Sequence, residues 1–163
     1  MNYFAEISTD KVIEPGELTL SIIWTAMQGY HAENERTVAM KPVAPEAAKA
    51  FDTILEARAK AADYLRPGYS CQDVYAAATG VMKRYGYQDM LPGRVGHGIG
   101  LGAHEYPSLG PGVEIEFVPG MVFSFEPSLR IGSLGGIQHS DTVLITEKGP
   151  EFLTHSPRGF LQA

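Results

Sequence analysis

Two histidines lie in the glycine-rich stretch GRVGHGIGLGAHEYPSLG at residues 93–110. His97 and His104 are seven residues apart, so a regular strand would place them on opposite faces. Glycine lets a backbone come close to a ligand, and imidazole can bind an ion or move a proton. The segment is therefore either a solvated glycine-rich loop or a site at which two imidazoles face a ligand.

Acidic residues in three further segments could complete such a site. Glu126 lies within the apolar stretch VFSFEPSL, where an unpaired buried carboxylate would be costly. Glu33 with Glu35, and His139 with Asp141, are spaced two residues apart and so share one strand face. Each feature alone also fits an exposed polar strand. Together they supply the mixture of acceptors and titratable bases that a hydrolytic site needs.

The remaining pattern predicts the elements that would bring these residues together. A run rich in β-branched and aromatic residues at 18–26 and a half-polar run at 31–40 predict a hairpin. Residues 45–68 have helical apolar spacing, and a capping box at residue 70 predicts a second helix ending at Gly86. Short strands between Gly and Pro turns follow. We therefore expect an α+β fold, with helices on the outer face of one curved antiparallel sheet.

Composition narrows the class of protein. The 163-residue chain has a formal net charge of −6 and no basic run, which argues against nucleic acid and anionic membrane surfaces as partners. No apolar run is long enough to span a bilayer, and the N-terminus lacks a signal-peptide layout. Cys71 stands alone, so no disulfide can form within one chain. We expect a cytoplasmic protein of one domain.

Ordered motifs along the chain resemble one family. GHGIGLGAHE, PGMVFSFEPSL and GGIQHSDTVLITEKGPEFLT, with the upstream VIEPGELTLSI and GYHAENERT, resemble the successive signatures of the pita-bread hydrolases. This family includes prolidase, aminopeptidase P, methionine aminopeptidase and creatinase. The resemblance covers roughly residues 8–155. It implies the pita-bread fold and hydrolysis of a C–N bond in a small polar substrate, such as an amidine, a guanidino acid or a dipeptide.

The resemblance also implies a metal site, from which this chain departs. The metallopeptidase members bind two metal ions through two Asp, one His and two Glu, and here His97 and Glu126 match the His and the first Glu. The other positions fall on Ile22, Glu33 and Ser140, of which Ile22 cannot bind a metal and Ser140 is a poor ligand. We therefore expect no metal cofactor. The alternative is Mn, Zn, Co or Fe held by Glu33, His97 and Glu126.

The loss of ligands favours the metal-independent creatinase branch. Glu35 precedes Arg-Thr and resembles the creatinase Glu that helps bind a guanidinium group, a role for which paired carboxylates are suited. We expect His97, His104 and Glu126 to be catalytic, with His104 stabilising charge on the substrate. The residues expected to bind the substrate are His31, Glu33, Glu35 and His139. The alternatives are a metal-dependent Xaa-Pro dipeptidase or aminopeptidase, and a catalytically inactive binding module.

The resemblance further implies that residues 1–163 are a partial catalytic domain. A complete pita-bread domain begins with about two more helices and a strand, and a creatinase-type base histidine is expected near residues 3–6, where the chain reads YFAE. The run at 18–26 is apolar on both faces. We therefore expect a homodimer, or association with the missing N-terminal part, that covers this strand and shields Trp24.

Overall fold

The computed structural model describes residues 10–163. The hairpin consists of β1 (Leu18–Met27) and β2 (Tyr30–Ala39), and the helices α1 (Pro45–Ala62) and α2 (Cys71–Arg84) follow it. The later elements are the 3-10 turns Gln88–Met90 and Gly132–Leu134 and the strands β3 (Gly96–Gly98), β4 (Glu105–Ser108), β5 (Val122–Phe125), β6 (Ser128–Arg130), β7 (Gly136–Gln138), β8 (Ser140–Thr146), β9 (Gly149–Phe152) and β10 (Leu161–Gln162).

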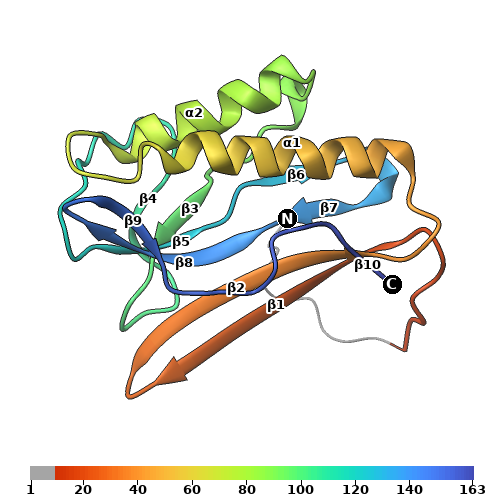
Figure 1. Cartoon of the computed structure of the whole chain (residues 1–163), viewed down its shortest axis with the longest axis horizontal. Coiled ribbons are helices and arrows are strands. Elements are labelled where there is room, and N and C mark those ends of the chain that lie inside the picture. Colours follow the sequence, from red (N-terminus) through yellow and green to blue (C-terminus); the bar gives the residue numbers. More distant parts are fainter. Residues whose placement is uncertain (1–9) are drawn as a thin grey trace.

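One sheet holds eight of the described strands. Its main order is β1-β2-β8-β5-β3-β4, with β9 paired to β8 and β10 paired to β2, while β6 and β7 form a separate pair. Only the β10–β2 pairing is parallel among these described pairs. Figure 1 shows both helices on one side of the sheet and the β1–β2 hairpin projecting away from them. The expected α+β architecture is confirmed.

The helix ends follow from local chemistry. Pro45 suits the first turn of α1, because an N–H group at that position would have no intrahelical partner and proline loses nothing by lacking one. α1 ends at Ala62 rather than at the predicted residue 68. Turns and bends occupy residues 63–68, and Gly68 has a φ of 87°, which is incompatible with a continuing helix. The predicted capping box of α2 is present between Ser70 and Asp73. Neither helix in residues 10–163 is long and apolar enough to cross a membrane.

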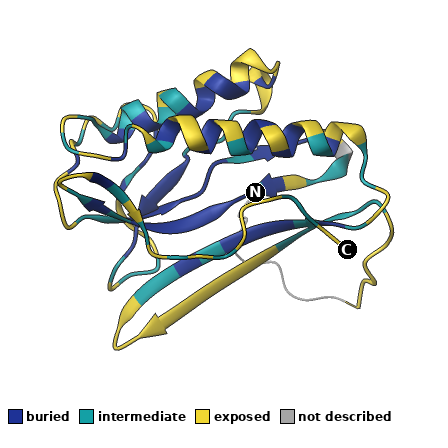
Figure 2. Ribbon diagram, in the orientation of Figure 1, coloured by how far each residue is buried: buried dark blue, intermediate teal, exposed yellow. Residues whose placement is uncertain are grey.

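The apolar core lies between the helices and the central strands. Its largest fully buried members include Phe51, Ile54, Phe123 and Phe125. β1 lies mostly outside this core and is largely exposed, as its yellow ribbon in Figure 2 shows, whereas β2 is mostly buried or intermediate. Sequence alone suggested cover on both faces of this strand, but within residues 10–163 Trp24 remains 39% exposed.

Candidate functional site

Three buried side chains converge from different strands. Glu33 lies on β2, His97 lies on β3, and Glu126 follows β5 directly. Each offers one ligand atom, and these atoms all lie within 4.8 Å of one another. His97 Nε2 lies 3.4 Å from Glu33 Oε2 and 3.8 Å from Glu126 Oε1. The structure thus brings together three residues that are up to 93 positions apart in the chain, and this group is the cluster discussed below.

Glycines allow the strands that carry this cluster to lie close together. A Cβ atom at Gly96 would lie 2.4 Å from the carbonyl oxygen of Ser124 on β5 and 2.6 Å from Leu109. At Gly98 it would lie 3.0 Å from the carbonyl oxygen of Tyr106. Neither glycine has a positive φ, so space and not a left-handed backbone requires glycine here. This close approach places His97 between β4 and β5.

The orientation of His97 is set by its own backbone neighbour. Nδ1 lies 2.8 Å from the carbonyl oxygen of Gly98, and a ring nitrogen facing a carbonyl must be the N–H donor. The neutral ring therefore carries its lone pair on Nε2, which points at the two carboxylates and has no hydrogen-bond partner. Although burial opposes it, the contact with Glu33 raises the pKa of His97, and nearby Glu126 adds to this effect.

Two serine hydroxyls orient Glu33. Ser124 Oγ donates to Glu33 Oε1 at 2.8 Å and Ser140 Oγ donates to the same oxygen at 3.0 Å. Glu33 Oε2 is buried without a hydrogen-bond partner and faces His97. Although burial opposes it, the adjacent His97 ring and the hydrogen bond from Ser124 hold the pKa of Glu33 below its ordinary value. Ser140 stands where the family resemblance places a metal ligand. Here its hydroxyl instead orients Glu33, which is itself a ligand candidate.

Glu126 is held by two residues that sequence reasoning missed. Arg94 Nε lies 3.3 Å from Glu126 Oε1, and Gln138 Nε2 donates to Oε2 at 3.1 Å. Burial and the negative charge of Glu33 raise the pKa of Glu126 to about 7, although His97 and Arg94 oppose the shift. A carboxyl group with such a pKa can accept and donate a proton near neutral pH. No pattern in the sequence marked Arg94 or Gln138, because both contacts join segments that meet only in the folded chain.

Glu35 lies beside the cluster on the same face of β2 as Glu33. Its side chain is buried, and neither carboxylate oxygen has a hydrogen-bond partner. Burial, together with the negative charges of Glu33 and Glu126, raises the pKa of Glu35 to about 9. The structure therefore places this predicted substrate-binding residue on the same strand face as Glu33, two residues along β2.

His104 lies at the exposed edge of the cluster. Its ring centroid is 4.1 Å from that of His97, with the rings inclined at 31°. Burial, followed by the nearby charges of His97 and Arg94, lowers the pKa of His104. His31 lies further along the hairpin, where its Nδ1 is 3.3 Å from the carbonyl oxygen of Gly100. Of these two predicted residues, only His104 contacts a member of the cluster.

His139 is not brought to the site and requires a correction. Its ring is fully buried on the helix side of the sheet, 6.1 Å from the Phe51 ring on α1, and neither ring nitrogen has a hydrogen-bond partner. β7 ends at Gln138 and β8 begins at Ser140, and it is Ser140 that faces Glu33. Because side chains alternate along a strand, a shift of one residue reverses the face.

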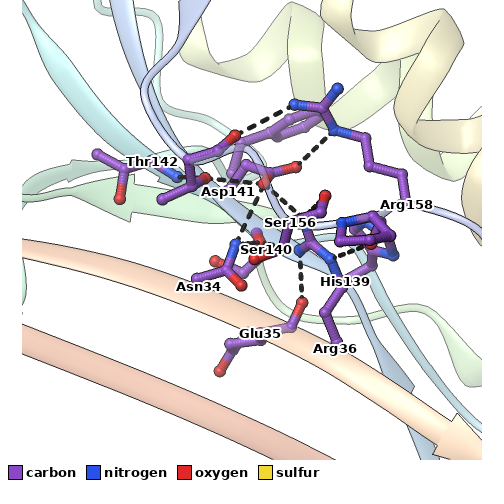
Figure 3. A network of polar contacts seen from close by, with 12 residues as sticks. Asn34, Glu35, Arg36, His139, Ser140, Asp141, Thr142, Ser156 and Arg158 are labelled. Carbon is purple, nitrogen blue, oxygen red and sulfur yellow. Dashed lines mark hydrogen bonds and ion pairs between the residues drawn. The ribbon is translucent and has the colours of Figure 1, made fainter. Parts of the chain in front are cut away.

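Asp141 likewise belongs to a network on the helix side. Figure 3 shows Arg36 and Arg158 converging on its carboxylate, and Arg58 from α1 also contacts it. Although burial opposes it, Arg58 and Arg36 hold the pKa of Asp141 below its ordinary value. This network joins the sheet, α1 and the C-terminal segment on the helix side of the sheet, opposite the face that carries the cluster. The predicted position of a base histidine, residues 3–6, lies outside the described residues.

The cluster fits one divalent cation. A histidine nitrogen and two carboxylate oxygens form a donor set typical of divalent metal sites, and two of the donor atoms are buried without hydrogen-bond partners. A second cation would need donors from the Ile22 and Ser140 positions. Ile22 has none, and the Ser140 hydroxyl is already bonded to Glu33. The described residues therefore provide for a single ion.

Comparisons with known proteins agree with this geometry. The chain matches metallopeptidase family M24 over residues 2–147. The Xaa-Pro dipeptidase of Pyrococcus furiosus is 33% identical over 155 residues, covering 95% of this chain and 44% of that protein. The prolidase structure from Pyrococcus horikoshii OT3 aligns with a TM-score of 0.90 and 30% identity, covering 94% of this chain and 44% of that one.

A second solved structure extends the comparison. The Xaa-Pro dipeptidase from Bacillus anthracis aligns with a TM-score of 0.93 and 26% identity, covering 99% of this chain and 45% of that one. The chain thus spans less than half the length of the relatives it matches. The family's description as metallopeptidases agrees with our alternative of a bound divalent ion, and our expectation of metal independence finds no support in it. The chain belongs to metallopeptidase family M24 and has the pita-bread fold of that family.

Proposed function

We propose that this protein hydrolyses a C–N bond in an Xaa-Pro dipeptide or a similar small substrate, using one divalent cation held by Glu33, His97 and Glu126. The observation that carries the proposal is the pair of buried atoms Glu33 Oε2 and His97 Nε2, 3.4 Å apart and without hydrogen-bond partners. Buried polar atoms are normally satisfied, so such a pair indicates a missing occupant. The names of the relatives supply the substrate class.

Each residue of the site has a distinct task in this proposal. Ser124 and Ser140 hold Glu33 so that Oε2 faces inward, and the Gly98 carbonyl holds His97 in the tautomer that can bind a cation. A bound divalent cation would supply Lewis-acid polarisation of the substrate carbonyl. Glu126 completes the donor set for the cation, and Arg94 and Gln138 hold its carboxylate in place. His104 donates a hydrogen bond to the substrate from the exposed edge.

A second candidate function rests on Glu35. Its two buried oxygens lack hydrogen-bond partners and lie near Glu126, which gives a cationic amidine or guanidino group a pair of carboxylates to bind. Such a substrate would be hydrolysed without a metal, with His97 and His104 moving protons. This is the creatinase-like function that the sequence led us to expect.

Cation binding is tested by calorimetric titration of the metal-stripped protein with Mn²⁺. We expect one ion per chain, with binding lost in Glu33→Gln and in Glu126→Gln. Glu35→Gln is the matched control, because Glu35 lies on the same strand face but outside the three-donor set. Retention of Mn²⁺ binding by Glu33→Gln, or no binding by the wild type, would reject the proposed cation site.

Substrate class is tested with Ala-Pro and creatine, each with and without a chelator. We expect Ala-Pro hydrolysis that the chelator abolishes and Mn²⁺ restores. Hydrolysis of creatine that is insensitive to the chelator would instead support the second candidate. Hydrolysis of neither substrate, with the fold intact, would leave a binding module without catalytic activity and reject both enzymatic proposals.

A further inference from the structure

A cavity of about 200 Å³ lies on the helix side of the sheet, opposite the face that carries the cluster. It is bordered by α1, the end of β5, β9 and the C-terminal segment. Two arginines, Arg58 and Arg158, are the only polar residues in its lining, whose apolar members are Leu55, Ala59, Ala62, Phe125 and Phe152. An apolar cavity with a few convergent polar groups is typical of a site for a small molecule.

Both arginines belong to the network around Asp141, which holds more positive than negative charge (Figure 3). Arg36 Nη2 lies 2.7 Å from Asp141 Oδ1, and Arg58 Nη2 and Arg158 Nε lie 2.5 Å and 3.1 Å from Oδ2. Within residues 10–163 no second carboxylate lies within 4.0 Å of these three guanidinium groups. Burial lowers the pKa of Arg58 to about 10, and the charges of Arg36 and Arg158 add to this shift while Asp141 opposes it. An anion beside the network would offset this excess of positive charge.

Arg158 has hydrogen-bond donors left for such an anion. Its Nη2 makes only a long contact of 3.5 Å with the carbonyl oxygen of Thr154, and its Nη1 has no hydrogen-bond partner in the part of the chain that the structure describes. The side chain is 45% exposed. Arg58 Nη1, in contrast, already donates to the carbonyl oxygens of Phe125 and His139. Arg158 is therefore the residue that can bind an anion directly, and Arg58 adds a second positive charge.

Aromatic rings hold both guanidinium groups at the wall of the cavity. The guanidinium carbon of Arg158 lies 4.6 Å from the centre of the Phe152 ring, and that of Arg58 lies 5.0 Å from the centre of the Phe125 ring. A guanidinium group stacked on a ring keeps its edge available to a carboxylate, which it binds through two parallel hydrogen bonds. The apolar lining favours a ligand that brings an apolar body with its charge over a small hydrated anion.

We propose that this cavity binds a small carboxylate with a compact apolar body, and we call it the carboxylate cavity. The carboxylate lies on Arg158, and the apolar body packs against the α1 side chains of the lining. A cavity of about 150 Å³ in another protein binds benzene, so a volume of about 200 Å³ accommodates one aromatic ring. The carboxylate cavity and the cluster lie on opposite faces of the sheet, so this inference does not depend on the proposed hydrolysis.

Binding is tested by titrating the metal-stripped, ¹⁵N-labelled protein with benzoate and following its amide signals by NMR. We expect saturable shifts in residues 152–158 and none in residues 96–98 of β3, which include His97. Benzamide has the same ring without the charge, and acetate has the charge without the ring. We expect each of these to bind at least about tenfold more weakly than benzoate, because the ion pair and the buried ring both contribute to affinity.

Two substitutions test the residues of the carboxylate cavity. Arg158→Gln removes the guanidinium group and should weaken benzoate binding about tenfold or more. Arg66→Gln is the matched control, because Arg66 also lies over a ring, 5.5 Å from the centre of Tyr69, but outside the cavity. Ala59→Leu adds volume at an exposed position of α1 that lines the cavity, and it should weaken benzoate binding without changing the free energy of unfolding.

Several results would overturn the inference. These are the absence of saturable shifts with benzoate, equal binding of benzoate and benzamide, and wild-type affinity in folded Arg158→Gln. Shifts in residues 96–98 in place of residues 152–158 would put the carboxylate beside the cluster and would also overturn it. If Arg158→Gln does not fold, wild-type affinity in Ala59→Leu rejects the carboxylate cavity. No measurement here uses a metal or an activity, so the proposed function can fail without changing this outcome.

Discussion

Ser140 and Asp141 are neighbours in the chain, yet their side chains lie on opposite faces of β8. Ser140 Oγ donates to Glu33 at 3.0 Å within the candidate site, whereas Asp141 Oδ1 accepts from Arg36 at 2.7 Å on the helix side. Alternation along one strand therefore links the site to the ion-pair network behind it. The network and the site can be altered separately, because their residues do not share a face.

Replacement of the central carboxylate should strongly destabilise the fold. In Asp141→Asn the guanidinium groups of Arg36 and Arg58 lose their buried ion-pair partner. Loss of one member of a buried pair costs about 3–5 kcal/mol, so we expect a drop of that size in the free energy of unfolding measured with urea. The control is Asp52→Asn, an exposed position on α1. A loss below about 1 kcal/mol would contradict the importance of this network.

His139 should make stability depend on pH. Burial, then Arg58, lowers the pKa of His139 to about 3 from the ordinary 6.5. Between these two values the unfolded chain binds a proton that the folded chain does not, so stability falls as pH falls. His139→Leu should remove this dependence. From pH 7 to pH 5 we expect the free energy of unfolding of the variant, measured with urea, to rise by about 2 kcal/mol relative to that of the wild type. A difference in stability between the two proteins that does not change with pH would contradict a buried neutral ring at His139.

A methyl group at Gly96 should disturb the site through the backbone. Its Cβ would lie 2.4 Å from the carbonyl oxygen of Ser124, so β3 and β5 must separate. We expect Gly96→Ala to lose about 1–3 kcal/mol of stability and to bind Mn²⁺ more weakly. Gly93→Ala is a matched control, because a Cβ there meets nothing within 4 Å. Equal behaviour of the two variants in urea unfolding would contradict this account.

Restoring the missing donors should change the number of bound ions. Ile22 and Ser140 stand where the resemblance places two further ligands, and both lie close to Glu33 or Glu35. We expect the double variant Ile22→Asp/Ser140→Glu to bind two Mn²⁺ ions per chain in calorimetry, since two added carboxylates provide for a second ion. Ile23→Asp, on the opposite face of β1, should leave one. A count of one in the double variant would contradict the assignment of these positions.

The outer edge of β1 should recruit another chain. β1 pairs with β2 alone among the described strands, and Ile23 on it is 59% exposed. Unpaired apolar edges tend to associate, so light scattering should detect a dimer, or a complex with the N-terminal part of the full-length protein. Iodide should then quench Trp24 fluorescence weakly. Ile23→Lys should favour the monomer. A monodisperse wild-type monomer with freely quenched Trp24 would contradict the prediction.

The sequence by itself determined the order of elements and the family. Alternation, helical spacing and the capping box are local properties, so the hairpin, both helices and the α+β class could be predicted from neighbouring residues. The ordered motifs carried the family resemblance, which the comparisons confirm. Motif matching also identified Glu33, His97 and Glu126 as candidates, because each lies in a segment with a recognisable pattern.

Only the tertiary structure decided how these residues meet. His139 was expected in the substrate site, but alternation along this segment turns His139 toward α1 and Ser140 toward Glu33. The contacts of Arg94 with Glu126 and of Ser124 with Glu33 likewise join segments that are distant in the sequence. Spacing within a segment fixes a side chain only relative to its own strand. Which strand lies opposite, in which register and on which face, depends on the packing of the whole sheet.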